Sequence, residues 1–230
     1  MPLPSVEIET AANPRHTVIW LHGLGADGHD FEPIVPELVD RAWPALRFVF
    51  PHAPVRPITI NNNKPMRAWY DISGLEIAQQ QDETGLRASM ALLDEMIARE
   101  TARGIPSENI LLAGFSQGGA IVLGGGIRHP RRLGGIAALS TYLPIAEKTD
   151  AEMSDANRHT PIFQAHGMLD PTIPHALGEM SRAYLAQRGY SVEWHPYQMA
   201  HQVCMDEILD LRRWIGARLA GAGLVGAGRG

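Results

Sequence analysis

Residues 110–120 have the sequence ILLAGFSQGGA, which joins an apolar run to a glycine-flanked serine and a helix-forming segment. Within it, Gly114-Phe115-Ser116-Gln117-Gly118 matches G-x-S-x-G, the pattern of a nucleophile elbow between a strand and a helix. The residues two before and two after the serine must be small, because larger side chains would collide with the neighbouring strand and helix. Such a turn places the Ser116 hydroxyl at the positive end of the helix. We therefore expect Ser116 to be a nucleophile, provided that the chain supplies a base, an acid and oxyanion donors.

The composition of the 230-residue chain indicates one compact domain with a sizeable core. Hydrophobic residues make up 45% of the chain, charged residues 20%, and the formal net charge is -5. There is no basic run, which argues against a nucleic-acid-binding protein. No apolar run approaches the ~18 residues of a membrane span. The sequence predicts a single domain over residues 1–220 and a Gly/Ala-rich tail, 221–230, that we expect to be disordered.

Cysteine content and the N-terminal residues predict a cytoplasmic protein. Cys204 is the single cysteine, so an internal disulfide is excluded and a reducing compartment is indicated. The first residues lack the charged region and the apolar core of a signal peptide. Cys204 is expected one turn into a helix and packed inward, which argues against its use as a nucleophile.

Apolar, β-branched runs alternate with segments of helical periodicity along most of the chain. This alternation is typical of an α/β fold with a mostly parallel sheet covered by helices on both faces. The predicted strands are 6–10, 16–22, 46–50, 110–115, 135–140, 161–166 and 191–195, and the predicted helices are 31–41, 83–103, 117–128, 175–188 and 202–219.

Residues 55–81 interrupt this alternation. They show no clear period, and they contain several prolines and Asn61-Asn62-Asn63. We predict a long loop here, with or without a short hairpin. It fits a lid or acyl-binding loop and, equally, an excursion packed on the core.

Among the ten histidines, His201 has the position expected of a base for the serine. In open parallel sheets, functional groups gather at the carboxyl ends of the strands, and His201 lies in a short loop after the last strand. The alternative is a histidine that caps the last helix. His22 and His166 end strands but precede glycine turns, so we expect them to be buried and structural. His16 and His129 lie away from the carboxyl ends.

Asp170 is the predicted acid that orients the base. It follows a strand and a glycine turn, and two nearby prolines stiffen its loop. The order Ser116, Asp170, His201 is the order that the elbow motif predicts. Three other acids are set aside as solvated or as lying on the wrong side of a helix: Asp150, Asp155 and Asp206. The oxyanion donors are expected to be the backbone N–H groups of Gln117 and Leu24.

Several motifs occur in a fixed order along the chain, and together they resemble one protein family. The motifs are His22-Gly23-Leu24-Gly25-Ala26-Asp27-Gly28, Trp69-Tyr70-Asp71-Ile72, Gly114-Phe115-Ser116-Gln117-Gly118-Gly119, Gly167-Met168-Leu169-Asp170 and Met199-Ala200-His201. They resemble the carboxylesterase and acyl-protein thioesterase (lysophospholipase-like) family of the α/β-hydrolase fold, from about residue 17 to 219. Ala200 departs from the pattern, because the residue before the histidine is usually glycine.

The resemblance implies a serine hydrolase that needs no cofactor and cleaves carboxylic esters of short to medium acyl chains. The alternative is an acyl-protein thioesterase or a lysophospholipase. The resemblance implies Ser116, Asp170 and His201 as a catalytic triad, with Leu24 and Gln117 at the oxyanion hole. It also implies an acyl channel along the 55–81 loop and allows a homodimer. The expected substrate-binding residues are Trp69, Ile72, Leu75 and Met168.

Other protein classes fit the sequence less well. Residues 23–28 also match G-x-G-x-x-G, the fingerprint of an NAD-dependent oxidoreductase, but the strand ending at Phe50 lacks the acid that would bind ribose. A non-catalytic binding protein of the hydrolase fold usually loses the serine, acid or histidine, and all three are present. A metal enzyme is disfavoured because the chain has no H-E-x-x-H pattern.

Overall fold

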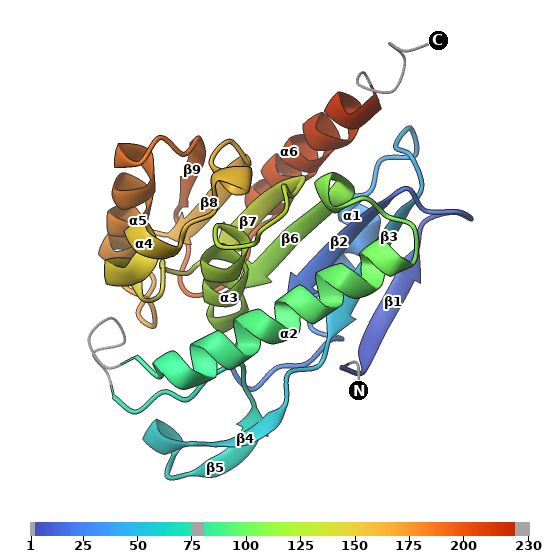
Figure 1. The fold of residues 1–230 in the computed structure, drawn as a ribbon. Coiled ribbons are helices and arrows are strands. Elements are labelled where there is room, and N and C mark those ends of the chain that lie inside the picture. The colour runs from blue at the N-terminus through green and yellow to red at the C-terminus, as the bar shows by residue number, and fades with distance from the viewer. Residues whose placement is uncertain (1–2, 75–80, 224–230) are drawn as a thin grey trace.

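The computed structural model describes residues 3–74 and 81–223, and its main feature is a seven-stranded sheet (Figure 1). The strand order is β1-β3-β2-β6-β7-β8-β9. β1 is antiparallel to β3, and all other neighbours are parallel. The predicted mostly parallel sheet is thus confirmed. The strands are β1 Ser5–Glu9, β2 His16–Leu21, β3 Leu46–Pro51, β6 Ile110–Phe115, β7 Gly135–Leu139, β8 Ile162–Gly167 and β9 Val192–Tyr197.

Helices cover both faces of the sheet, which explains why its central strands are apolar throughout. Ile19 and Leu21 of β2 belong to the hydrophobic core on one face, and Val18 and Trp20 to the core on the other. α2 and α3 lie on the first face and α1 and α6 on the second (Figure 1). The helices are α1 Val35–Leu38, α2 Glu83–Ala102, α3 Gln117–Gly126, α4 Thr149–Glu152, α5 His175–Gln187 and α6 Met205–Gly223.

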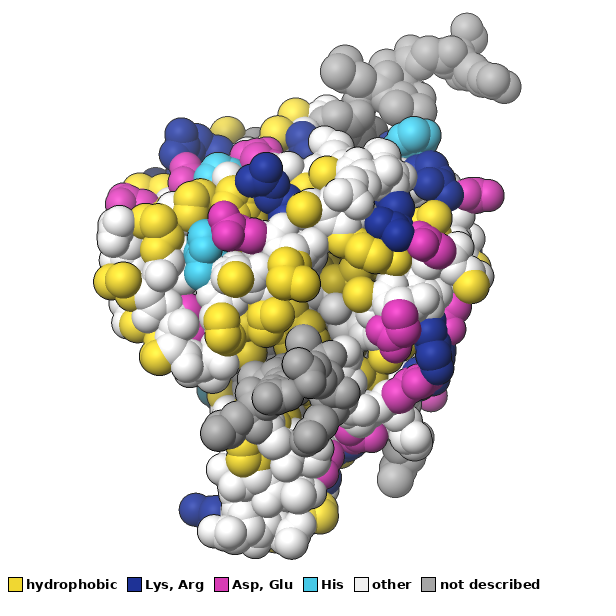
Figure 2. Space-filling model, turned by 90° about the vertical axis from the view of Figure 1, so that its left-hand side faces the viewer, with side chains coloured by type: hydrophobic (Ala, Val, Ile, Leu, Met, Phe, Trp, Pro, Cys, Tyr) yellow, Lys and Arg dark blue, Asp and Glu magenta, His cyan; other side chains and the backbone are white. Residues whose placement is uncertain are grey.

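None of the helices within the described ranges has the length and apolar character needed to cross a membrane. In Figure 2, hydrophobic side chains gather in the middle of one face, and charged side chains lie mostly toward its edges.

The helix predicted over residues 31–41 is mostly absent. A 3-10 turn at Glu32–Ile34 leads into α1, which ends at Leu38. Pro33 and Pro36 fall in the first turn of each, where a missing N–H is tolerated, and Val39 is already extended. The apolar spacing therefore predicted correctly which side chains are buried, but it did not predict the length of the helix.

The last helix begins later and ends later than predicted. Tight turns across residues 197–202 delay α6 to Met205, so Cys204 precedes the helix and is only partly buried. The expectation that Cys204 packs inside the helix was wrong. The helix continues to Gly223, which includes the first residues of the predicted tail; residues 224–230 lie outside the described part.

The sequence predicted a loop over residues 55–81 with or without a short hairpin, and the structure contains the hairpin. β4, Val55–Ile58, pairs with β5, Lys64–Arg67, in an antiparallel ribbon. Asn62 and Asn63 have φ angles of 55° and 57°, the left-handed conformation that asparagine tolerates in turns. The prediction for Leu75 falls outside the described residues.

Candidate active site

Ser116 occupies a sharp turn between β6 and α3. Its φ is +54° and its ψ −117°, a backbone conformation that is rare outside glycine. Its N–H donates to Leu139 O at 2.9 Å, which ties the turn to β7. A Cβ on Gly114 would lie 2.5 Å from Gly118 O, and one on Gly118 would lie 2.4 Å from Leu21 O. The G-x-S-x-G spacing is therefore a steric requirement of this turn.

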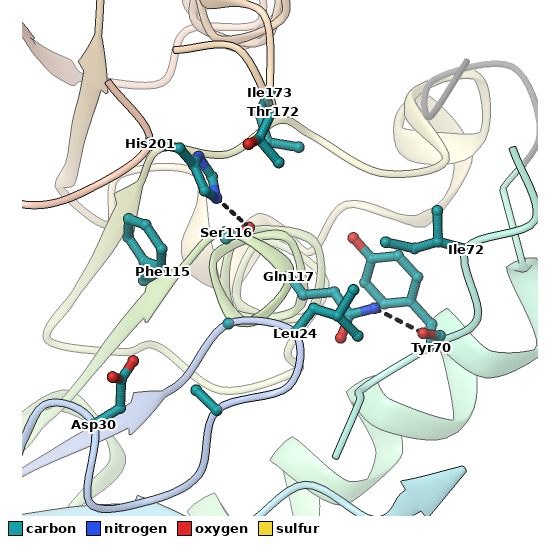
Figure 3. A pocket seen from close by; sticks show the side chains of 12 residues that line it. Leu24, Asp30, Tyr70, Ile72, Phe115, Ser116, Gln117, Thr172, Ile173 and His201 are labelled. Atoms are coloured by element: carbon teal, nitrogen blue, oxygen red, sulfur yellow. Dashed lines mark hydrogen bonds between the residues drawn. The ribbon is translucent and has the colours of Figure 1, made fainter. Parts of the chain in front are cut away.

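Three loops at the carboxyl edge of the sheet bring Ser116, His201 and Asp170 into one hydrogen-bonded chain. His201 Nδ1 donates to Asp170 Oδ2 at 2.7 Å, since an ionised carboxylate can only accept. His201 Nε2 then accepts from Ser116 Oγ at 2.9 Å (Figure 3). The structure thus brings together the three residues predicted from the order and spacing of the motifs. This arrangement can remove a proton from the serine hydroxyl.

The Asp170 carboxylate is fully buried but well supplied with donors. Its Oδ1 accepts from the backbone N–H groups of Thr172 at 2.8 Å and Ile173 at 2.9 Å. Its Oδ2 accepts from His201. These bonds offset the cost of burying a charge and fix the direction of the second oxygen.

His166 and His22 are buried, as the sequence predicted, and each supports a loop of the site. His166 Nε2 donates to Ile173 O at 2.9 Å. His22 Nδ1 donates to Gly23 O at 2.7 Å, and its Nε2 accepts from Ala53 N–H at 3.0 Å. Desolvation by burial is the main cause that lowers the pKa of both rings, so both are neutral near pH 7. No hydrogen bond among the described residues joins either ring to Ser116.

A cavity of about 290 Å³ opens beside Ser116 and His201 (Figure 3). Leu24, Gln117 and Ile72, three of the residues predicted to form the site, also line it. The full lining is Gly23, Leu24, Ala26, Asp30, Tyr70, Ile72, Phe115, Ser116, Gln117, Thr172, Ile173 and His201.

Gln117 has two separate structural functions. As the first residue of α3 it has a backbone N–H without an intrahelical acceptor, next to Ser116. Its side chain accepts from Trp69 N–H at 2.8 Å and donates to Tyr70 O at 2.7 Å. The same residue therefore has a free backbone N–H beside Ser116, and its side chain holds the backbone of the segment that forms one cavity wall.

Comparison with known proteins decides the family. The Phospholipase/Carboxylesterase family model matches residues 4–219. The chain belongs to the phospholipase/carboxylesterase family. It is 37% identical over 226 residues to acyl-protein thioesterase 1 of Neurospora crassa, covering 94% of this chain and 92% of that one. A probable carboxylesterase of Oryza sativa subsp. japonica is 34% identical, with 93% and 81% covered.

A solved structure agrees with this assignment. The crystal structure of Arabidopsis thaliana SOBER1 superposes with a TM-score of 0.84 at 30% identity, covering 89% of this chain and 99% of that one. The predicted family and the α/β-hydrolase fold are thus confirmed, and the chain is a hydrolase of the esterase and thioesterase type. The dinucleotide-binding alternative for residues 23–28 is not supported, because in this hydrolase the loop lines the cavity beside Ser116.

Two predicted substrate-binding residues of the hydrolase lie elsewhere. Trp69 is fully buried behind the cavity wall, where its indole N–H donates to His22 O at 2.9 Å. Met168 is 39% exposed, and its N–H continues the β8 ladder to Tyr197 O, outside the cavity. Both expectations followed from motif membership, which places a residue near a site but does not say which way its side chain points.

Sequence reasoning missed several cavity residues. Phe115, Thr172 and Ile173 adjoin motif residues, so their neighbours in sequence were a usable signal. Asp30 gave no signal, because it lies after the motif that ends at Gly28 and before the apolar period that begins at Phe31.

Proposed function

We propose that this hydrolase cleaves acyl thioesters, with S-acylated cysteines of proteins as its substrate class and oxygen esters of the same acyl groups as further substrates. The observation that supports hydrolysis is the hydrogen-bonded chain Ser116–His201–Asp170 beside the cavity. The sequence favoured oxygen esters, with thioesters as the alternative. The alternative is preferred here because the similar curated relatives include acyl-protein thioesterases of several fungi.

Acylation would begin with attack by Ser116 Oγ on the thioester carbonyl carbon. His201 Nε2 accepts the hydroxyl proton, and the Asp170 carboxylate stabilises the imidazolium that forms. The backbone N–H groups of Leu24 and Gln117 would donate to the developing oxyanion. Collapse of the tetrahedral intermediate breaks the carbon–sulfur bond, and the thiolate leaves with the proton that His201 returns.

Deacylation would repeat these steps with water. His201 accepts a proton from a water molecule, which attacks the Ser116 acyl ester. The second tetrahedral intermediate expels Ser116 Oγ, which regains its proton from His201. The products are a carboxylic acid and the free enzyme, so the cycle needs no cofactor.

The acyl group would lie against Leu24, Tyr70 and Ile72. These side chains lie on the same side of Ser116 in the cavity (Figure 3). Tyr70 OH is within 3.3 Å of Tyr142 OH, so the hydroxyl has a partner and the ring offers an apolar face. An apolar wall of this kind favours apolar acyl groups over polar ones.

The test compares a thioester and an oxygen ester of the same butyryl group and the same carbon skeleton in the leaving group. We expect a higher kcat/KM for the thioester. Ser116→Ala should lower both values by about 10⁴-fold or more while the far-ultraviolet circular dichroism stays unchanged. A fluorophosphonate should label Ser116 in the wild type.

Two results would contradict the proposal in different ways. Thioester hydrolysis within tenfold of wild type in Ser116→Ala would remove the serine mechanism. A faster oxygen ester, with both activities still dependent on Ser116, would favour the carboxylesterase that the sequence predicted.

A further inference from the structure

Asp30 introduces a carboxylate into a cavity whose other described lining side chains include no acid. It lies on the loop after β2, on the side of Ser116 opposite Tyr70 and Ile72 (Figure 3). Phe115 lies on the same side as Asp30. The two sides of the cavity therefore differ in chemistry, since one is apolar and the other combines an aromatic ring with a carboxylate.

The Asp30 carboxylate has no partner in residues 3–74 and 81–223. Its backbone N–H donates to Asp27 O at 3.1 Å, but no hydrogen bond or ion pair is made by its side chain within these ranges. Partial burial and then the negative charge of Asp27 raise its pKa, and no cation offsets them. A positive group arriving from a substrate would therefore find an unpaired acceptor.

The side of the cavity that holds Asp30 is the side on which a leaving group would depart. His201 must return a proton to the leaving atom, so that atom lies next to the His201 ring. The Phe115 ring is 4.8 Å from the His201 ring, centroid to centroid. In the cavity, the side chain of Phe115 lies between those of His201 and Asp30 (Figure 3).

We propose that Asp30 and Phe115 form a cation-binding subsite for the leaving group. The preferred substrates are then esters and thioesters whose alcohol or thiol carries a positive charge a few atoms from the scissile bond. A carboxylate beside an aromatic ring suits ammonium groups, because the charge pairs with one and lies against the π-face of the other. Such a group is supplied by a choline-type leaving group or by a lysine next to an S-acyl cysteine. This inference rests on the proposed hydrolytic function.

The first experiment compares two thioesters that differ in charge but hardly in shape. Butyrylthiocholine has a trimethylammonium group, and S-(3,3-dimethylbutyl) thiobutyrate has a tert-butyl group in its place. Wild type should favour the cationic thioester by roughly 5-fold in kcat/KM, the scale of one partly exposed charge pair. Asp30→Asn should bring the ratio close to one by lowering only the rate on the cationic substrate.

Glu32→Gln is the control, because it removes one negative charge two positions along the chain, in the 3-10 turn, and Glu32 does not line the cavity. The ratio should persist in this variant and should fall toward one in 1 M NaCl, which screens exposed charges. An unchanged ratio in Asp30→Asn, or a ratio of one in wild type, would overturn the subsite.

The neutral thioester separates this inference from the function on which it rests. If wild type cleaves both thioesters at equal rates, the proposed hydrolase stands and the subsite fails. If it cleaves neither, the proposed function fails and the subsite fails with it.

A second experiment distinguishes the two sources of the cation. S-butyryl-cysteine peptides are compared with lysine or norleucine beside the cysteine. A lysine preference that Asp30→Asn abolishes supports the subsite and assigns it to protein substrates. A preference confined to thiocholine supports it and assigns it to small cationic leaving groups. No preference in either series would overturn it.

Discussion

Two histidines lie beside the same carboxylate, and they are built for different purposes. His201 Nδ1 is 2.7 Å from Asp170 Oδ2, and His166 Nε2 is 3.6 Å from the same atom. His201 is partly exposed and has Ser116 at its other nitrogen. His166 is wholly buried and gives its proton to Ile173 O.

Closeness to the carboxylate therefore does not separate the two rings. The partner of the second contact does, because it is a serine hydroxyl for His201 and a backbone carbonyl for His166. His201 keeps a lone pair that faces a hydroxyl and the cavity. His166 uses its proton to hold the turn that contains Thr172 and Ile173, whose N–H groups fix Asp170. In the proposed mechanism, His201 exchanges protons with the substrate, and His166 keeps the carboxylate in position.

The largest difference between the two histidines is expected in kcat/KM. His201→Gln should lower kcat/KM on p-nitrophenyl butyrate by about 10⁴-fold, because no other side chain in the described ranges hydrogen-bonds to Ser116 Oγ. His166→Gln should lower it by less than about tenfold, because an amide can still donate to Ile173 O. Losses of equal size would mean that the two rings act as one unit.

The next effect should come from the shared acid. Asp170→Asn should lower kcat by about 10³-fold, since an amide neither stabilises the imidazolium nor selects the tautomer of His201. KM should change little, because Asp170 does not line the cavity. Steady-state kinetics with a thioester will measure both, and a rise in KM with kcat unchanged would contradict the assignment.

Replacing His166 should reduce stability more than replacing His201, the reverse of their expected effects on kcat/KM. His166→Ala removes a fully buried ring and strands Ile173 O, so the free energy of unfolding should fall by about 2–4 kcal/mol. His201→Ala removes a partly exposed ring and should cost less than about 1 kcal/mol. Urea denaturation of both variants will test this, and equal losses would show that burial does not separate the two sites.

The smallest effect is a dependence of stability on pH. Burial lowers the pKa of His166 below the ordinary histidine value of 6.5, so the unfolded chain binds a proton at this ring more readily than the folded chain. The stability from the neutral ring is therefore present above about pH 6.5 and declines as the pH falls below it, by at most about 1.4 kcal/mol per unit.

The measurement is the difference in unfolding free energy between wild type and His166→Gln at pH 7 and pH 5. The difference isolates this ring from other groups that titrate, such as Glu207, whose pKa burial raises to about 8. The advantage of wild type over the variant should shrink at pH 5. An advantage that grows at pH 5 would mean that the buried ring is charged.

The sequence predicted the sheet well because its central strands are buried on both faces. A strand of this kind is a continuous apolar run, and β2 and β6 stand out for that reason. The segment after β2 was harder, because apolar spacing reports burial and not helix length. Only the prolines at 33 and 36 indicated that α1 would be short.

In the candidate site, spacing predicted the residues that the backbone turns place. Ser116, Asp170 and His201 follow strand ends in the order of the elbow family, so topology alone brings them together. The sequence could not predict the directions in which side chains point. Trp69 turns into the core, and the Gln117 side chain spans to the backbone of residues 69–70, a contact between segments far apart in the sequence.

The short turn that holds Asp170 has a practical consequence for protein engineering. Thr172 and Ile173 supply the amides that restrain the acid, and their side chains also line the cavity. Enlarging the cavity at Ile173 would therefore disturb the contacts of Asp170 together with the shape of the cavity. Ile72 lines the cavity from a separate segment, so mutant libraries aimed at bulkier acyl donors should start there.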